Sequence, residues 1–314
     1  MEFFKKAIFK IIYFIMLGAF SLYILLDMFI IEKVEISNII ATNNKSSNST
    51  STNNSENSAT NTEESKSSNY TITSNTYSDD NITIKISEIR QYNTDIYIAD
   101  VQLSSIEYLK TAFANSTYGR NIKAKTSTIA EQNNAILAIN GDFYGYRNKG
   151  FVLRNGIVYR NSINTSGTDE DLVINSNGDF SIVQESTSDI NEILNQGALQ
   201  VLSFGPSLIN NSTISVSTTE EVNQSKSSNP RTVIGQIDSL HYVFVVSDGR
   251  TSASSGLSLY ELAEVMQNLG CKVAYNLDGG GSSTMYFNGE IVNNPTDGMT
   301  SGERSVSDIV YIGY

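Results

Sequence analysis

The sequence predicts a single strand-rich α+β domain with few helices, preceded by a transmembrane helix and a disordered tether. Three observations support this prediction: a long apolar run near the N-terminus, a Ser/Thr/Asn-rich segment behind it, and short blocks of alternating apolar residues from residue 81 onward. We assign residues 1–40 to a cytoplasmic tip and membrane anchor, 41–80 to a linker and 81–314 to one globular domain. The chain of 314 residues is long enough for such a domain to bury a sizeable core.

The first element is the apolar run Ala7–Leu26. About 20 apolar residues at roughly 1.5 Å each span the hydrocarbon core of a bilayer. No small-residue cleavage site follows the run, so it predicts an uncleaved signal-anchor. Because Lys5, Lys6 and Lys10 precede it, the positive-inside rule places the N-terminus in the cytoplasm. The sequence thus predicts a single-pass protein of the cell membrane whose globular domain is extracytoplasmic.

The second element is the linker. From Ser46 to Asn69 nearly every residue is Ser, Thr or Asn. Such a segment cannot bury enough apolar surface to offset its ordering entropy, so we expect a flexible tether. This polar, uncharged composition is frequent in bacteria with AT-rich genomes and indicates a bacterial source.

The globular domain begins with two alternating segments, Ile82–Ile86 and Ile96–Val101, which predict paired strands. Asn-Gly pairs at residues 155–156, 177–178 and 288–289 predict hairpin turns. Further strands are predicted at Ala135–Ile139, Arg231–Gln236, His241–Val246, Val273–Leu277 and Ser305–Ile312.

Two capping boxes predict helices in this domain. Thr128 with Glu131 predicts a short one, and Ser258 with Glu261 predicts a longer one that ends before Gly270. Many strands and few helices define the α+β class.

Composition excludes several functional classes. The net charge is −12, which argues against nucleic acid as a partner, because phosphate neutralisation needs a basic face. A single Cys and a single His exclude a disulfide framework and zinc sites built from several such residues. His241 heads a predicted strand, and we interpret it as a strand-edge residue. Cys271 is interpreted as a buried, unreactive thiol.

The most informative stretch is the loop after the Val273–Leu277 strand. It reads Asp278-Gly279-Gly280-Gly281-Ser282-Ser283-Thr284. Glycines let a backbone approach a ligand closely, and successive free N–H groups can bind an anion. Asp278 stands at the strand end, where a carboxylate can act as a base, a nucleophile or a metal ligand. A glycine-rich turn without a ligand is the alternative interpretation.

Polar residues also end other predicted strands. Asn140-Gly141-Asp142 follows one strand, Asp248-Gly249-Arg250 follows a second, and Arg231 begins a third. Carboxylates, arginines and exposed backbone N–H groups suit an anionic ligand with hydroxyls, such as a sugar phosphate. Arg231, Arg250 and Arg304 are the phosphate candidates, because Arg binds oxyanions bidentately.

Taken together, these motifs resemble the bacterial branch of the phosphodiester glycosidase family. The resemblance covers residues 81–314 and is carried, in family order, by Asn140-Gly141-Asp142-Phe143-Tyr144, Phe204-Gly205-Pro206, Asn229 to Gly235, Asp248-Gly249-Arg250, Ser258 to Glu261, Asn276 to Thr284, and Glu303 to Asp308. It implies that residues 81–314 form a catalytic domain that hydrolyses a sugar-1-phosphodiester at the anomeric C–O bond.

The resemblance also implies roles for individual residues. Asp278 is the first candidate for the catalytic carboxylate and Asp142 the second, while Glu261 either supports the site or caps its helix. The expected substrate-binding residues are Asn140, Arg231, Asp248, Arg250, Gly279, Gly280, Gly281, Ser282, Ser283, Thr284 and Arg304. No cofactor is required by this chemistry, and a divalent cation such as calcium or magnesium is left open.

Two other functions stay open at this point. Asp142, Asp248 and Asp278 are hard oxygen ligands, so the domain could be a metal-assisted phosphodiesterase that cleaves P–O. It could also be a non-catalytic glycan-binding module on a stalk. The predicted location suggests a cell-envelope glycan, such as an exopolysaccharide with sugar-phosphate links, as the substrate.

Overall fold

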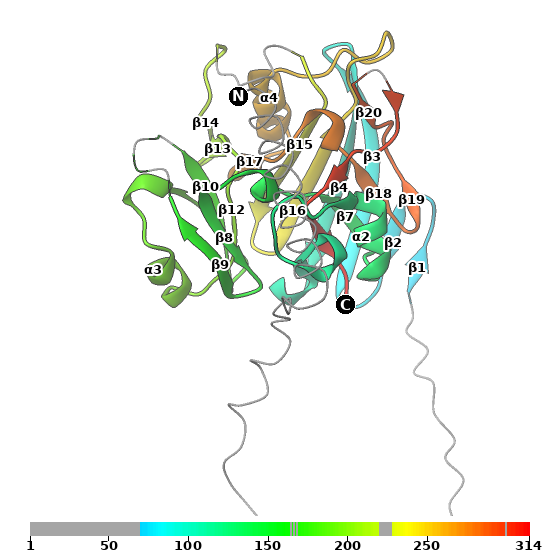
Figure 1. Ribbon diagram of the computed structural model, residues 1–314. Helices are drawn as coiled ribbons and strands as arrows, with labels where there is room; N and C mark the ends of the chain where they lie inside the picture. Colours follow the sequence, from blue (N-terminus) through cyan, green and yellow to red (C-terminus); the bar gives the residue numbers. More distant parts are fainter. Residues whose placement is uncertain (1–69, 164, 166, 168, 220–227, 299) are drawn as a thin grey trace, which may run out of the picture. The chain divides into compact units, whose positions relative to one another are not determined.

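The structure is a computed structural model that describes residues 70–163, 165, 167, 169–219, 228–298 and 300–314 (Figure 1). The predicted anchor and all of the linker up to residue 69 lie outside these residues. Within the described ranges, no helix is both long and apolar enough to cross a membrane.

A nine-stranded antiparallel sheet forms the largest layer, in the order β1-β2-β3-β4-β16-β15-β17-β13-β14. Its strands are β1 (Thr71–Ile72), β2 (Thr76–Ser78), β3 (Ile82–Gln91), β4 (Thr94–Leu103), β13 (Ser207–Asn210), β14 (Thr213–Ile214), β15 (Arg231–Asp238), β16 (His241–Ser247) and β17 (Val273–Asn276).

Two five-stranded sheets pack beside it. One has the order β11-β10-β12-β8-β9 and contains β8 (Gly150–Arg154), β9 (Ile157–Ser162), β10 (Glu170–Asn175), β11 (Phe180–Gln184) and β12 (Ala198–Leu202). The other has the order β19-β18-β7-β23-β5 and contains β5 (Leu109–Phe113), β7 (Leu137–Asn140), β18 (Met285–Phe287), β19 (Glu290–Ile291) and β23 (Asp308–Ile312). Two small ladders pair β20 (Thr296–Asp297) with β21 (Thr300–Ser301) and β22 (Ser305–Val306) with β6 (Ala124–Lys125).

The described residues contain three α-helices: α2 (Thr126–Gln132), α3 (Ile190–Asn195) and α4 (Leu259–Asn268). The capping box predicted for α4 is confirmed, because Ser258 Oγ accepts from the Glu261 backbone N–H and the Glu261 carboxylate accepts from the Ser258 N–H. The box predicted at Thr128 is wrong: α2 begins at Thr126 without a side-chain cap. Ser127 instead donates its N–H and hydroxyl to Glu303, far along the chain.

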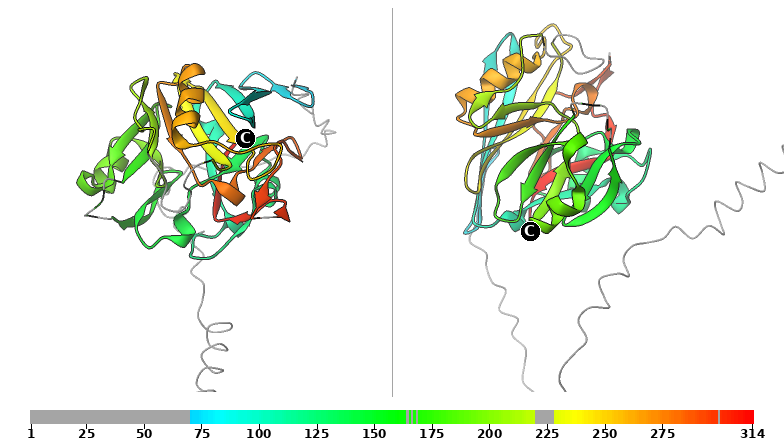
Figure 2. Two further views of the ribbon diagram at one scale, coloured as in Figure 1. Left: turned by 90° about the horizontal axis from the view of Figure 1, so that it is seen from above. Right: turned by 90° about the vertical axis from the view of Figure 1, so that its left-hand side faces the viewer.

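The large sheet is covered on both faces. Ile84, Ala99 and Phe244 belong to the core that it shares with the two five-stranded sheets, whereas Ile98 and Val243 belong to the core under α4. This alternation explains why β4, β15 and β16 are buried along most of their length. Helices α2 and α3 bury their apolar sides in separate small cores. In the view from above, the yellow strands of the large sheet lie between the green five-stranded sheet and the cyan strands β3 and β4 (Figure 2).

The predicted paired strands and hairpins are confirmed. Strands β3 and β4 pair in antiparallel register, and β8–β9, β10–β11 and β18–β19 turn at the three Asn-Gly pairs. At the first turn, Asn155 and Gly156 have φ values of 51° and 77°, which is the left-handed region that this turn type requires. The predicted strand over Ser305–Ile312 is divided at Ser307 into β22 and β23.

The folded region begins earlier than the sequence predicted. Strands β1 and β2 lie within the stretch assigned to the linker and extend the large sheet through pairing with β3. Tyr77 of β2 is buried in the main core, and its hydroxyl donates to Asp79 at 2.6 Å. Asp79 also accepts from the backbone N–H groups of Asn81 and Ile82 at the start of β3. Together with the pairing to β3, these contacts make residues 71–80 part of the domain.

Truncation tests this boundary. Removing residues 1–69 keeps β1 and β2, whereas removing residues 1–80 deletes both and the buried Tyr77 ring. We expect the shorter protein to lose about 3 kcal/mol of unfolding free energy relative to the longer one, the usual cost of deleting a buried aromatic side chain. Urea unfolding of the two truncations measures the difference, and equal transition midpoints would contradict the assignment.

Candidate active site

Asn140, the last residue of β7, joins the two sheets at the candidate site. Its Oδ1 accepts from Thr232 Oγ1 of β15 at 2.8 Å and from the Thr284 N–H at 3.3 Å. Its Nδ2 donates to the backbone carbonyl of Asp278 at 2.7 Å. One fully buried amide therefore fixes the start of β15 and both ends of the glycine loop to the turn that follows β7.

Asp278 is the acidic residue of that loop, and the residue is partly buried. Its Oδ2 accepts from Ser282 Oγ at 2.6 Å, and its backbone N–H donates to the Gly141 carbonyl at 3.4 Å. Burial raises the pKa of Asp278 to about 6, while the Ser282 hydrogen bond and the Arg304 charge counter part of that rise. A carboxylate with such a pKa can hold or release a proton near neutral pH.

The predicted row of free loop N–H groups is only partly present. The N–H of Gly280 donates to the Pro230 carbonyl at 2.8 Å, and those of Ser282 and Ser283 donate to carbonyls within the loop. The buried hydroxyls of Ser283 and Thr284 have no hydrogen-bond partner among the described residues. These two oxygens are therefore side-chain atoms of the loop that could bond a ligand.

Two arginines lie against the glycines of the loop. A Cβ on Gly280 would lie 2.8 Å from Arg250 Nη2, and one on Gly281 would lie 2.7 Å from Arg304 Nη2. Arg250 is exposed and donates to the amide oxygen of Asn229 at 3.0 Å, whereas Arg304 pairs with Asp297 at 2.7 Å. A side chain at either position would displace a guanidinium group, and the positive φ of 63° at Gly280 also favours glycine there.

Arg231 and Asp248, two other expected ligands, are buried in structural contacts. Arg231 is 2% exposed, and its Nε donates to the Leu257 carbonyl at 2.8 Å. Asp248 accepts from the Asn294 N–H at 2.9 Å and from the Tyr97 hydroxyl at 3.2 Å. These bonds tie the ends of β15 and β16 to neighbouring loops.

Asp142 lies in a buried ion-pair network beneath the site. Arg154 Nη2 lies 2.8 Å from Asp142 Oδ2 and 2.8 Å from Asp308 Oδ2. Asp142 also accepts from the backbone N–H groups of Ser203 and Tyr144, both at 2.9 Å. The side chains of both aspartates are 0% exposed. The negative charge of Asp142 thus contributes to the raised pKa of Asp278. The Asp142 carboxylate itself is bonded by N–H donors and is not exposed.

Asp308 has fewer hydrogen-bond partners than Asp142. Burial and the nearby Asp142 charge raise the pKa of Asp308 to about 8, with Arg154 opposing the rise. Its Oδ1 has no hydrogen-bond partner among the described residues and faces the Cα of Gly141. Any Cβ at position 141 would collide with this carboxyl, which explains the glycine in the turn.

Glu261 serves as the helix cap. Its Oε2 accepts from both the N–H and the hydroxyl of Ser258, at 2.8 and 2.9 Å. Of the two roles that the sequence left open, the structure shows the capping contact. His241 begins β16 and bonds Asp100 at 3.1 Å, while Cys271 is buried, and its burial raises the pKa of its thiol to about 12.

The three carboxylates that the metal-dependent alternative needs, Asp142, Asp248 and Asp278, do not come together as a metal site. Asp142 and Asp248 use their oxygens for the N–H and hydroxyl donors described above, and of the three only Asp278 is a partly exposed residue. Among the residues with a described position, no group of three His, Cys, Asp or Glu side chains is arranged to hold a metal ion.

Sequence reasoning missed Arg154 and underused Asp308. Arg154 ends a strand that is buried at every position, and a charge there requires an ionic partner. That requirement is the one signal in the sequence that could have singled it out. Its partners lie 12 and 154 residues away, so no local motif connects them.

The fold and this site define a class: a strand-rich α+β domain with a titratable carboxylate and two arginines at strand ends, suited to acid–base chemistry on an anionic ligand. The chain belongs to the phosphodiester glycosidase family, whose model matches residues 133–313. All the predicted site residues fall within the matched range.

Three relatives extend this comparison. The chain is 27% identical over 257 residues to the SPbeta prophage-derived uncharacterized protein YomE of Bacillus subtilis strain 168, and the match covers 78% of this chain and 39% of that protein. It is 35% and 36% identical over 86 residues to the N-acetylglucosamine-1-phosphodiester alpha-N-acetylglucosaminidases of mouse and human. Those matches cover 26% of this chain and 16% of each enzyme, so the chain spans well under half the length of the curated relatives.

Solved structures support the fold. The zebrafish N-acetylglucosamine-1-phosphodiester alpha-N-acetylglucosaminidase catalytic domain, auto-inhibited by its pro-peptide, aligns with a TM-score of 0.58 and 19% identity, over 74% of this chain and 83% of that one. A hypothetical protein from Synechocystis aligns with a TM-score of 0.52 and 16% identity, over 74% and 62% of the two chains.

The Arg154 network makes a stability prediction. Replacing Arg154 with Met leaves two buried carboxyls without their cation, which should cost about 3–5 kcal/mol of unfolding free energy near pH 8. The loss should shrink at pH 5, because the carboxyl of Asp308, whose pKa is raised to about 8, is then neutral and needs no cation. Urea unfolding at the two pH values measures this loss.

The control is Arg90→Met, which breaks the surface pair with Asp95 and should cost about 1 kcal/mol or less. Equal losses in the two variants would contradict a central role for Arg154.

Proposed function

We propose that this protein hydrolyses a sugar-1-phosphodiester at the anomeric C–O bond, with Asp278 as the catalytic carboxylate. The observation that carries the proposal is a partly exposed Asp278 with a pKa raised to about 6, placed on a glycine loop between two arginines. Membership of the phosphodiester glycosidase family supports the reaction class, and the activity named for the mouse and human relatives supports a sugar-1-phosphodiester as the substrate.

Hydrolysis at the anomeric carbon requires one ionised carboxylate. The leaving group is a phosphate monoester, which departs without much help from a general acid. A base is still needed to activate water, or a nucleophile to attack the anomeric carbon. Asp278 is ionised above about pH 6 and can serve either role, with Ser282 holding one of its oxygens in place.

Arg250 and Arg304 stabilise the negative charge of the leaving phosphate in this proposal. Within the described residues, Arg250 has no carboxylate within ion-pair distance, so its full charge is available to a phosphate. Arg304 shares its charge with Asp297. Two guanidinium groups against one loop can stabilise the developing negative charge in the transition state. The Ser283 and Thr284 hydroxyls add donors close by.

Asp142 takes a positioning role in this proposal. Its carboxylate is bonded to Arg154, Ser203 and Tyr144 and is not exposed. Its negative charge lies near Asp278 and helps to raise the pKa of that carboxyl. It therefore acts on the reaction through Asp278 and through the shape of the turn after β7.

We further propose that the protein is tethered to the cell membrane, with the domain outside the cytoplasm and acting on a cell-envelope glycan that carries sugar-phosphate links. The apolar run Ala7–Leu26 and the lysines before it support the tether and its orientation. The Ser/Thr/Asn-rich linker would give the domain reach over a polymeric substrate.

Replacing Asp278 with Asn tests the catalytic assignment. We expect turnover of an N-acetylglucosamine-1-phosphodiester to fall by about 100-fold or more, the usual loss for a general base. The matched control is Asp238→Asn, the same change at an exposed carboxylate that pairs with Lys272, and it should keep wild-type activity. Release of the phosphate monoester measures both. An Asp278→Asn variant with full activity would overturn the assignment.

The raised pKa of Asp278 also predicts two pH dependences. The rate should climb as pH rises to about 6 and then level off, because the base must be ionised.

The stability of the fold should change in the opposite sense as pH rises. The folded-state pKa exceeds the ordinary value of 3.8, so the stability contributed by the protonated carboxyl is present below pH 4 and lost as pH rises through about 6. Asp278→Asn should therefore raise the melting temperature at pH 8 and leave it nearly unchanged at pH 4.

A further inference from the structure

A second concave region lies on the side of β5. It is a pocket of about 220 Å³ whose walls include the aromatic side chains of Phe113, Tyr159 and Tyr311. Ser116, Asn133 and Arg154 are among its other lining residues. Ligand pockets for drug-sized molecules measure about 300 Å³ or more, so this one suits a single sugar-sized unit.

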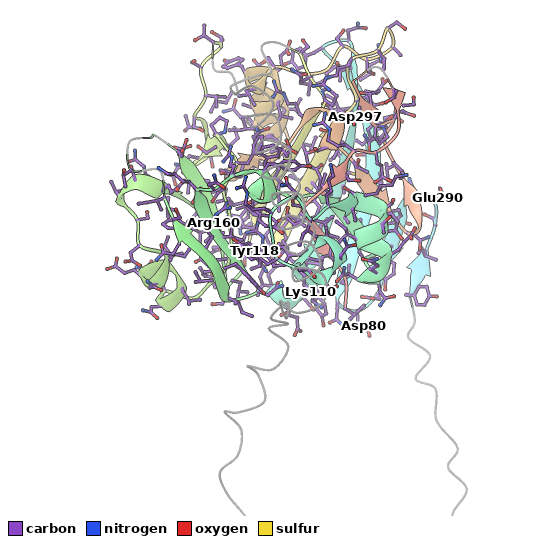
Figure 3. The ribbon with its side chains drawn as sticks, in the orientation of Figure 1. Asp80, Lys110, Tyr118, Arg160, Glu290 and Asp297 are labelled. Carbon is purple, nitrogen blue, oxygen red and sulfur yellow. The ribbon has the colours of Figure 1, made fainter. Side chains whose placement is uncertain are left out.

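The pocket is separate from the Asp278 site. Strand β5 is the edge strand of its sheet, and the pocket lies between that edge and the β8–β9 hairpin. None of its lining residues belongs to the glycine loop. Figure 3 shows Asp297, the partner of Arg304, far above Lys110 of β5 and above Tyr118, whose ring lies 5.0 Å from that of Tyr159.

The aromatic wall is rigid. The rings of Phe113 and Tyr159 meet edge to face at 4.9 Å and 85°, and Phe113 makes a similar contact with Tyr144 at 5.2 Å. Tyr118 stacks on Tyr144 at 5.3 Å. Rings that are already held by their neighbours can pack against the C–H face of a pyranose with little loss of side-chain entropy.

Several polar groups of the wall are neutral and unused, whereas the side chains of Thr111 and Asn155 hydrogen-bond Gln200. The hydroxyls of Ser116, Tyr159 and Tyr311 bond no other group in the part of the chain that the structure describes, and Asn133 uses only its Nδ2, on the Ile129 carbonyl. Arg154 is the one charge in the wall, and its partners Asp142 and Asp308 neutralise it. This inventory disfavours a phosphate and favours a neutral ligand with several hydroxyls.

A peptide strand fits less well, although β5 is an edge strand. The Thr111 carbonyl, which a partner strand would need, already accepts from Asn155 Nδ2 at 3.1 Å. We propose that this pocket binds a neutral pyranose unit of a glycan, at a second binding site apart from the Asp278 centre. The choice of a glycan as ligand rests on the proposed function, whereas binding itself requires no turnover.

Titration of the full chain with methyl N-acetyl-β-glucosaminide tests the inference, with saturation-transfer NMR of the sugar as the readout. We expect a millimolar dissociation constant, as is usual for one sugar in a shallow site. Tyr159→Ala should weaken binding at least tenfold, and Tyr159→Phe, which keeps the ring and its packing, about threefold. Asp278→Asn and the control Tyr70→Ala, an exposed tyrosine outside the pocket, should leave the affinity unchanged.

Three results would overturn the inference: no binding of this sugar, unchanged binding by both Tyr159 variants, or loss of binding with Asp278→Asn alone, which would place the sugar at the glycine loop. The hydrolysis assay separates this inference from the proposed function. Sugar binding that depends on Tyr159 in a protein without phosphodiester turnover would keep this site and overturn only the activity.

Discussion

The buried guanidinium of Arg154 is the interaction on which the rest of the site depends. It ends β8 of one five-stranded sheet and meets Asp308 at the start of β23 in the other, with Asp142 of the intervening turn as its second partner. Two ionised carboxylates that are fully buried would repel each other strongly without this cation. Because Arg154 holds them together, the turn at Gly141 can pass directly over Asp308 and present its carbonyl to the backbone of Asp278.

The same arrangement divides the carboxylates by role. Asp142 and Asp308 are sealed beneath the turn, whereas Asp278 stays partly exposed on a loop that Asn140 fixes at both ends. Burial of Asp278 and, to a smaller extent, the negative charge of Asp142 raise the pKa of its carboxyl, and the Ser282 hydrogen bond and the Arg304 charge limit that rise. The buried ionic layer thus adds to the effect of burial on the carboxyl that we propose as the catalytic group, and such shifts are common at catalytic sites.

Sequence patterns predicted what is local. The Asn155-Gly156 turn and the Ser258–Glu261 capping box are short-range signals, and both formed as expected. The glycine loop was found because an unusual run of residues follows a strand. The predictions that were wrong or missing concern residues whose partners lie far along the chain. Glu303, and not the Thr128–Glu131 pair, accepts from the N-terminus of α2, and the role of Arg154 follows only from its contact with Asp308. Asp142 looked available in the sequence, because nothing within the turn reveals the guanidinium that covers it.

In the proposed reaction the anomeric C–O bond breaks, with Asp278 acting at the sugar and the arginines at the phosphate. The position of solvent oxygen in the products tests this most directly. Hydrolysis of an N-acetylglucosamine-1-phosphodiester in water enriched in heavy oxygen, followed by mass spectrometry of both products, locates the label. Cleavage of the C–O bond would place the label on the sugar. A label on the phosphate would contradict it, because it would mean that the P–O bond is cleaved and that Asp278 does not act at the anomeric carbon.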